Sequence, residues 1–186
     1  MGKAILVTGG ARSGKSSLAE KLAKEQNGSV LYIATAVPFD EEMKKRVQKH
    51  RESRPQEWDI YEGYRGLGKY IAEKGQKYDT ILLDCITVMI TNIFLDFPDL
   101  NYENPKFEDF EIVEEAIRKE AEELMEGIKQ SAVNVIMVTN ELGSGIVPEN
   151  LMARVFRDIA GRANQYIASQ CDEVYLTVCG LPMKLK

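Results

Sequence analysis

The sequence is poor in the residues that build disulfides and metal clusters. Its 186 residues include one histidine, His50, and three cysteines, Cys85, Cys171 and Cys179. The cysteines are odd in number and lack the spacing of metal ligands, which argues against a disulfide framework and against a metal site. We therefore expect all three to be reduced thiols in the hydrophobic core.

The chain also lacks a surplus of positive charge and a long hydrophobic run. It carries 24 Lys and Arg against 29 Asp and Glu, for a net charge of -5. Proteins that bind nucleic acid normally present a basic face, so no nucleic-acid partner is expected. No apolar run approaches the roughly 20 residues of a membrane span, and an expected strand begins almost at the N-terminus in place of a signal peptide. These features predict a cytoplasmic protein without a membrane span.

The remaining composition is that of a globular protein, with 44% hydrophobic and 28% charged residues. Apolar runs predict five strands, at residues 4–8, 30–34, 80–84, 133–139 and 173–178. Helical spacing is clearest in the apolar stripe formed by Phe110, Val113, Ile117, Ala121, Leu124 and Ile128. Strands alternating with helices predict a mostly parallel sheet with helices on both faces. We expect one α/β domain over residues 1–186.

A phosphate-binding loop lies between the first strand and an expected helix at residues 17–26. It fits the pattern G-x-x-x-x-G-K-[ST] and consists of Gly9, Gly10, Ala11, Arg12, Ser13, Gly14, Lys15 and Ser16. Glycines let successive backbone N–H groups point at an anion, and the helix N-terminus adds partial positive charge. Lys15 is expected to reach the terminal phosphates and Ser16 to ligate Mg²⁺. A glycine-rich turn could match by chance, but the strand before it and the helix after it favour nucleotide binding.

The apolar run at residues 80–84 ends in an acid, Asp84. We expect the strand adjacent to the phosphate loop to end at this position and to bring Asp84 near the Mg²⁺ that bridges the phosphates. The alternative is an acid that begins a turn or caps the next helix. Beside a phosphate loop, the metal role is favoured.

Residues 40–55 form a strongly charged, helix-like segment that contains His50. A lone histidine on such a helix is usually a solvated surface residue. Here Lys49, Arg51 and Arg54 surround the imidazole with positive charge, which lowers its pKa, keeps it neutral and supplies donors for phosphate oxygens. The segment is therefore a candidate nucleophile site for phosphate chemistry, and a plain basic patch that only positions a nucleotide stays open.

A third polar stretch follows the expected strand at residues 133–139. It reads Asn140-Glu141-Leu142-Gly143-Ser144-Gly145 and would lie at the edge where ligands bind in such sheets. The next expected helix carries Arg154, Arg157, Asp158 and Arg162 at three- and four-residue spacing. A salt-bridged helix face and a role in substrate or subunit contacts are both open.

With these stretches in place, the sequence resembles the bifunctional adenosylcobinamide kinase / adenosylcobinamide-phosphate guanylyltransferase family. The resemblance covers essentially the whole chain. It rests on the blocks ILVTGGARSGKSSLAE, LYIATA, DEEMKKRVQKHRESRP, ILLDCITVMITN, VTNELGSGIVPEN, ARVFRDIAGRANQ and DEVYLTVCGLPMKLK, in this order. The phosphate-loop block alone is only moderately specific, whereas the joint match is strong.

The resemblance implies two reactions on a RecA-like P-loop fold. A nucleoside triphosphate, ATP or GTP, phosphorylates the aminopropanol hydroxyl of adenosylcobinamide. GTP then donates GMP to that phosphate through a covalent guanylyl-histidine, which gives adenosylcobinamide-GDP and pyrophosphate. The family also tends to assemble as a homotrimer, and Mg²⁺ is the expected cofactor.

The resemblance also assigns residues to these roles. His50 matches the guanylylated histidine, and Lys49 precedes it where some members carry a second histidine. The nucleotide-binding positions are the phosphate loop from Gly9 to Ser16, together with Ala34, Thr35, Ala36, Arg51, Glu52, Ser53, Arg54, Glu62 and Asp84. Lys15 and His50 are the expected catalytic residues, and Ser16 and Asp84 the expected metal ligands.

Two other functions compete with this hypothesis. A P-loop kinase of another small metabolite would phosphorylate its acceptor without guanylyl transfer, and His50 would be incidental. A nucleotide-dependent switch or assembly ATPase would hydrolyse slowly without an acceptor. Against a GTPase switch, the chain has no Asn-Lys-x-Asp motif, and its net charge of -5 does not favour a motor on a nucleic-acid polymer.

Overall fold

The computed structural model describes residues 2–37, 55–98, 100, 102 and 105–186. The charged segment at residues 40–54, expected to be helical, lies outside the described residues, and with it the predicted site residues His50, Arg51, Glu52, Ser53 and Arg54.

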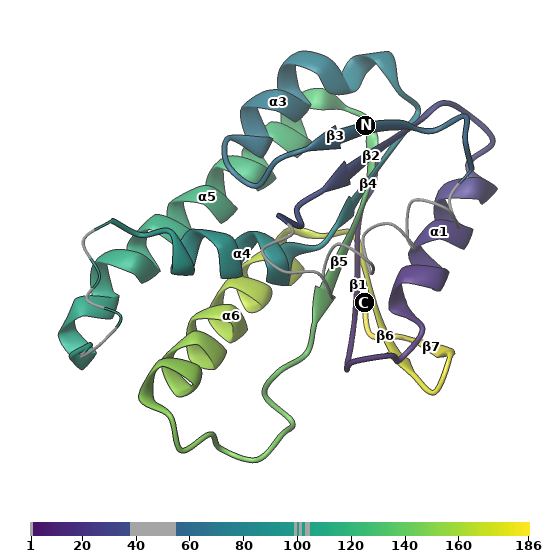
Figure 1. Cartoon of the computed structure of the whole chain (residues 1–186). Coiled ribbons are helices and arrows are strands. Elements are labelled where there is room, and N and C mark those ends of the chain that lie inside the picture. Colours follow the sequence, from purple (N-terminus) through teal and green to yellow (C-terminus); the bar gives the residue numbers. More distant parts are fainter. Residues whose placement is uncertain (1, 38–54, 99, 101, 103–104) are drawn as a thin grey trace.

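Within the described residues, seven strands form one sheet (Figure 1). The strands are β1 (Ala4–Gly9), β2 (Val30–Ala34), β3 (Asp59–Glu62), β4 (Thr80–Asp84), β5 (Asn134–Asn140), β6 (Glu173–Val178) and β7 (Leu181–Lys184). Their order across the sheet is β3-β2-β4-β5-β1-β6-β7. All neighbours pair in parallel except β6 and β7, which are antiparallel. The predicted mostly parallel sheet is confirmed.

Helices cover both faces of this sheet (Figure 1). They are α1 (Lys15–Glu25), α3 (Leu67–Lys74), α4 (Ile86–Leu95), α5 (Phe110–Ser131) and α6 (Leu151–Gln170), with short 3₁₀ turns η1 (Gly75–Lys77) and η2 (Phe107–Asp109). Alternate residues of each strand face opposite sides. Ile5 and Val7 of β1 pack in a core with α1, whereas Leu6 packs in the larger core with α3, α4, α5 and α6. No helix among the described residues is long and apolar enough to span a bilayer.

The apolar stripe predicted for α5 is buried along its whole length, from Phe110 to Ile128. At one point α5 approaches α3 so closely that only glycine fits on either helix. A Cβ atom on Gly68 of α3 would collide with the backbone carbonyl of Glu123, and one on Gly127 of α5 would collide with the carbonyl of Gly68. Two glycines thus set how near the helices lie.

The five predicted strands are confirmed, but β3 and β7 are additional. Both are edge strands of four residues, with the sequences DIYE and LPMK, and their side chains are mostly exposed. Edge strands need no continuous apolar run and tolerate proline, so their sequences carry no buried-strand pattern. β7 returns antiparallel to β6 through a two-residue turn, Cys179-Gly180, in which both residues have positive φ.

The expectation of three core thiols is wrong for one cysteine. Cys85 and Cys171 are buried, whereas Cys179 is exposed. Its place in the β6–β7 turn, with a φ of 52°, projects it away from the core.

Candidate functional site

The phosphate loop lies between the end of β1 at Gly9 and the start of α1 at Lys15. Gly14 adopts a φ of 97°, a conformation that glycine accepts readily, and it turns the chain into the helix. Inside the loop, the Lys15 ammonium donates to the Gly10 carbonyl at 3.0 Å, and the Ser13 N–H donates to the same carbonyl at 3.3 Å. The N–H groups of the first turn of α1 are thereby presented at the carboxyl edge of the sheet.

The β6–β7 hairpin supports this loop from one side. The Thr177 hydroxyl donates to the Thr8 carbonyl at 3.0 Å. It also lies 3.0 Å from the Ser13 hydroxyl. Because the Thr177 proton is used by Thr8, the Ser13 hydroxyl donates to Thr177. The Gly180 N–H donates to the Ser13 carbonyl at 2.8 Å. A side chain on Gly14 would begin 3.0 Å from the Gly180 Cα atom, so the turn and the loop are in contact.

Sequence reasoning missed the supporting role of Thr177 and Gly180. The available signal was the Cys179-Gly180 dipeptide between Thr177-Val178 and Leu181-Pro182, which is compatible with a tight hairpin. That signal says nothing about which loop the hairpin touches, because the contact joins the two ends of the sequence.

Asp84 is at the predicted sheet edge, but the expectation that its strand adjoins β1 is wrong. β5 lies between β1 and β4. Gly9 is paired with Asn140 and Asp84 with Val138, so two strand spacings, about 10 Å, separate the phosphate-loop strand from Asp84. By strand alternation, the side chain of Asp84 lies on the α1 face of the sheet, as does that of Leu82.

The charges of Lys15 and Asp84 both affect the pKa of Cys85. Burial first, and then the negative charge of Asp84, raise the pKa of the Cys85 thiol to about 12, while the charge of Lys15 acts in the opposite direction. Both charges therefore act on the same buried sulfur. Cys85 stays a protonated thiol at neutral pH and is not a nucleophile.

Three other predicted residues, Ala34, Thr35 and Ala36, lie at the carboxyl end of β2. The Thr35 hydroxyl is buried, donates to the Cys85 carbonyl at 2.8 Å and accepts from the Cys85 N–H at 2.8 Å. It therefore holds the peptide that follows Asp84. The flanking alanines are half-buried.

Glu62 ends the outermost strand, β3, and is exposed. Four strand spacings, about 19 Å, separate β3 from β1. The described residues thus bring Lys15, Ser16 and Asp84 to one edge of the sheet around the phosphate loop, and they leave Glu62 apart from it.

A closed ring of hydrogen bonds fixes the carboxyl end of β5. The Asn140 N–H donates to the Thr87 hydroxyl at 2.7 Å. The Thr87 hydroxyl in turn donates to the Thr139 hydroxyl at 3.1 Å. Thr139 donates to the Asn164 side-chain oxygen at 2.8 Å, and the Asn164 amide returns to the Asn140 carbonyl at 3.1 Å. The ring joins α4, β5 and α6.

The loop after β5 is stabilised by hydrogen bonds to the carboxylate of Glu141. The Glu141 N–H donates to the Gly9 carbonyl at 3.0 Å, beside the phosphate loop. Its carboxylate accepts from the Gly143 N–H at 2.6 Å and from the Ser144 N–H at 3.1 Å. Partial burial would raise the pKa of Glu141, but the bonds from Ser144 and Gly143 and the charge of Arg157 outweigh it and lower the pKa. A cavity of about 360 Å³ lies behind this loop, against α6.

The arginines of α6 mainly make structural contacts. Arg162 forms an ion pair with Glu114 of α5, and Arg157 lies 3.9 Å from Asp158. Arg154 donates to the carbonyls of Pro148 and Glu149 in the preceding loop. These contacts support the hypothesis of a salt-bridged helix, although the strongest pair crosses to a neighbouring helix.

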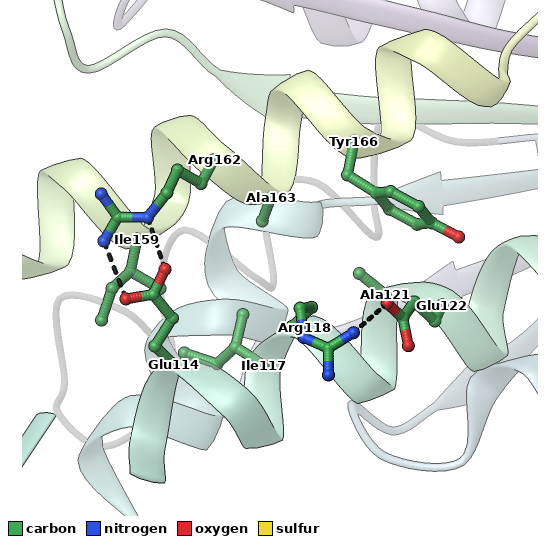
Figure 2. A pocket seen from close by; sticks show the side chains of 9 residues that line it. All are labelled: Glu114, Ile117, Arg118, Ala121, Glu122, Ile159, Arg162, Ala163 and Tyr166. Atoms are coloured by element: carbon green, nitrogen blue, oxygen red, sulfur yellow. Dashed lines mark hydrogen bonds and ion pairs between the residues drawn. The ribbon is translucent and has the colours of Figure 1, made fainter. Parts of the chain in front are cut away.

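Figure 2 shows the groove between α5 and α6, with a volume of about 160 Å³. The pair Arg162–Glu114 closes one end and the pair Arg118–Glu122 lies near the other, while Ile117 and Ala121 of α5 and Ala163 of α6 line the groove between them. Of the described residues, none of those predicted to bind nucleotide or metal lines this groove.

Comparison with known proteins identifies the family. Residues 5–185 match the family described as cobinamide kinase / cobinamide phosphate guanyltransferase. The chain is 43% identical over 182 residues to the bifunctional adenosylcobalamin biosynthesis protein CobU of Escherichia coli K12, covering 98% of this chain and 99% of that protein. It is 46% identical, with the same coverage, to CobU of Salmonella typhimurium LT2. It is 39% identical to CobP of Pseudomonas aeruginosa, covering 97% of this chain and 96% of that protein.

Among solved structures, the fold is similar to that of an ATPase from the type III secretion system of pathogenic bacteria. The TM-score is 0.53 and the sequence identity 14%, over 95% of this chain and 52% of that one. At this identity the likeness concerns the fold alone, and it confirms the expected RecA-like P-loop architecture. With the near full-length sequence matches, it follows that the chain belongs to the cobinamide kinase / cobinamide phosphate guanyltransferase family of bifunctional transferases.

Proposed function

We propose that the phosphate loop and the carboxyl ends of β4 and β5 form the site where adenosylcobinamide is phosphorylated. The observation that carries this proposal is the arrangement of Lys15, Ser16 and Asp84 at one sheet edge, around a loop that Thr177 and Gly180 hold through Ser13. The acceptor hydroxyl attacks the γ-phosphorus and loses its proton to water. The bond between the γ-phosphorus and the β-phosphate oxygen breaks, and a nucleoside diphosphate leaves. Lys15 and the loop amides neutralise the charge that develops.

Mg²⁺ suits the residues present. Mg²⁺ usually keeps several waters and takes one or two protein oxygens besides the substrate phosphates. The Ser16 hydroxyl in the first turn of α1 and the half-buried Asp84 carboxylate are such oxygens. When bound, the ion would neutralise charge on the phosphates. Ser16 and Asp84 would hold it directly or through water.

The second reaction is proposed to use His50 as nucleophile. Its imidazole attacks the α-phosphorus of GTP, the bond to the β-phosphate breaks, and pyrophosphate leaves with its electron pair. A phosphate oxygen of adenosylcobinamide phosphate then displaces the imidazole and forms adenosylcobinamide-GDP. Arg51 and Arg54, next to His50 in the sequence, are the proposed partners of the phosphate oxygens. The resemblance and the adjacent basic residues support this role.

Labelling separates the proposed reactions from the two competing functions. The protein is incubated with GTP labelled in its α-phosphate and then denatured, as wild type, His50→Ala and Lys15→Ala. An acid-labile, alkali-stable label on wild type but not on His50→Ala is expected. A parallel assay with labelled γ-phosphate and cobinamide should lose product in Lys15→Ala.

The other outcomes are equally distinct. Phosphorylated cobinamide without any protein label would leave a kinase alone and would remove the role of His50. Hydrolysis that does not depend on cobinamide would support the switch or assembly ATPase. Sedimentation of the same protein tests the proposed homotrimer, and fractionation of cells tests the proposed cytoplasmic location.

A further inference from the structure

We propose that the side-chain amide of Asn140 binds the γ-phosphate of the nucleoside triphosphate and acts as a catalytic residue of the kinase step. The inference rests on the proposed function, because it requires the phosphates to lie on the loop from Gly9 to Ser16. It assigns the residue that distinguishes a triphosphate from a diphosphate at that site.

The position of Asn140 follows from the strand order. β5 lies between β1, which leads into the phosphate loop, and β4, which ends in Asp84. Asn140 is paired with Gly9, at the level where the loop begins, while Asp84 is paired with Val138. Asn140 therefore stands two residues, about 7 Å, beyond the level of Asp84 along the strand direction. It occupies the gap between the loop and the acid.

Strand alternation places the amide on the side of the sheet that carries α1. Ile136 and Val138 pack in the core with Ala19 and Ala23 of α1, and Asn140 is the next member of this row. Lys15 begins the same helix. The amide of Asn140, the ammonium of Lys15 and the carboxylate of Asp84 thus lie on one face, at one edge.

The side chain of Asn140 is free to bind a ligand, whereas its backbone N–H and carbonyl already make hydrogen bonds. The N–H and the carbonyl are bound by Thr87 and Asn164. In the part of the chain that the structure describes, the half-buried side-chain amide itself makes no hydrogen bond. Its atoms are not fully buried, so an unpaired amide held on a fixed backbone is open to a ligand contact. An amide N–H can donate to a phosphate oxygen without adding charge.

The neighbouring acid is not an alternative for this role. Glu141 follows Asn140, but its carboxylate is bound to the N–H groups of Gly143 and Ser144. A carboxylate would also repel the γ-phosphate. Among the polar residues at the end of β5, Asn140 is the one whose side chain is free to donate.

The test compares triphosphate with diphosphate binding. Mg²⁺ and either ADP or the imido analogue of ATP, with the guanosine pair as a parallel series, are titrated calorimetrically into wild type, Asn140→Ala and Asn140→Asp. Loss of one hydrogen bond to a charged group should weaken analogue binding by about tenfold or more in Asn140→Ala. Diphosphate affinity should change by less than about twofold. The turnover number of cobinamide phosphorylation should fall by at least the same factor as analogue affinity.

Asn134→Ala is the matched control, since Asn134 begins the same strand at its other end. Asn134→Ala should leave the affinities for both ligands and the turnover number unchanged. Asn140→Asp keeps the size of the side chain, so it should fold even if Asn140→Ala does not, and it should lose more triphosphate affinity through charge repulsion. Equal weakening of triphosphate and diphosphate, or wild-type binding by Asn140→Asp, would overturn the proposal. Absence of nucleotide binding by wild type would instead refute the proposed function.

Discussion

Ser13 and Thr177 lie 164 positions apart in the sequence, yet their buried hydroxyls are 3.0 Å from each other. This contact joins the phosphate loop to the strand at the opposite end of the chain. Because Thr177 also donates to the Thr8 carbonyl, one hydroxyl serves both the strand that enters the loop and the loop itself.

Thr177→Val should therefore weaken nucleotide binding and stability together. Valine keeps the shape of threonine but leaves the Thr8 carbonyl and the Ser13 hydroxyl without this partner, at a cost of about 1–3 kcal/mol in the free energy of unfolding. Urea unfolding and ATP titration measure the two effects. Thr177→Ser retains the hydroxyl and should stay close to wild type; if both variants behave alike, the hydrogen bond is not what supports the loop.

Thr139→Val should break the hydrogen-bond ring at the end of β5. Thr139 is fully buried, and its loss leaves the Asn164 oxygen and the Thr87 hydroxyl each short of one partner. We expect a destabilisation of about 1–3 kcal/mol and a fall in the turnover of cobinamide phosphorylation. The comparison with Thr139→Ser separates the hydroxyl from the methyl group. A stable variant with wild-type turnover would show that the ring does not position Asn140.

Gly68→Ala should disturb the crossing of α3 and α5. The added Cβ meets the carbonyl of Glu123, which belongs to the backbone and cannot rotate away. Overpacking of this kind costs about 1–3 kcal/mol, more than the helix propensity gained. Gly161→Ala in α6 is the control, because a Cβ there would meet nothing within 4 Å. That variant should be stabilised by up to about 1 kcal/mol. Equal effects of the two substitutions on urea unfolding would contradict the steric argument.

Glu173 should contribute stability that is lost in acid. Its carboxylate accepts from the Tyr175 hydroxyl at 2.6 Å and pairs with Lys3 at 2.9 Å, and these contacts lower the pKa of Glu173 to about 2. A carboxylate with a folded-state pKa below its unfolded value of 4.5 stabilises fully above about pH 5 and loses that contribution between about pH 4.5 and 2.

Glu173→Gln tests this linkage. The difference in the free energy of unfolding between wild type and Glu173→Gln should be largest near pH 6 and should shrink as the pH falls toward 2. Urea titrations across this range give the curve. A constant difference at every pH would mean that the charge of Glu173 is irrelevant to stability.

Local patterns predicted the buried strands well and the edges poorly. The strands β2 and β4 begin and end at the predicted residues, because both faces of each strand are buried and most of their residues are apolar. Asp59–Glu62 and Leu181–Lys184 carry no such pattern, since their pairing uses backbone atoms and their side chains face solvent.

The part of the site formed by residues that are contiguous in the sequence was predictable. The phosphate loop is contiguous, so its glycines, Lys15 and the following helix could be placed from spacing alone. The separation of Asp84 from that loop could not be predicted in this way. It arises because β5 lies between β1 and β4, and this order depends on the path of the crossover connections. No residue pattern within β1 or β4 encodes that path. The role of Thr177 was hidden for the same reason.

The pairing of the phosphate loop with the β6–β7 hairpin has a consequence for synthesis on the ribosome. The loop sequence is translated before Thr177 and Gly180, which hold Ser13 in place. A nascent chain that has exposed β1 through β5 still lacks this support. The supported conformation of the loop is therefore complete only after the hairpin has emerged, so an interrupted translation product carries the loop sequence without these contacts.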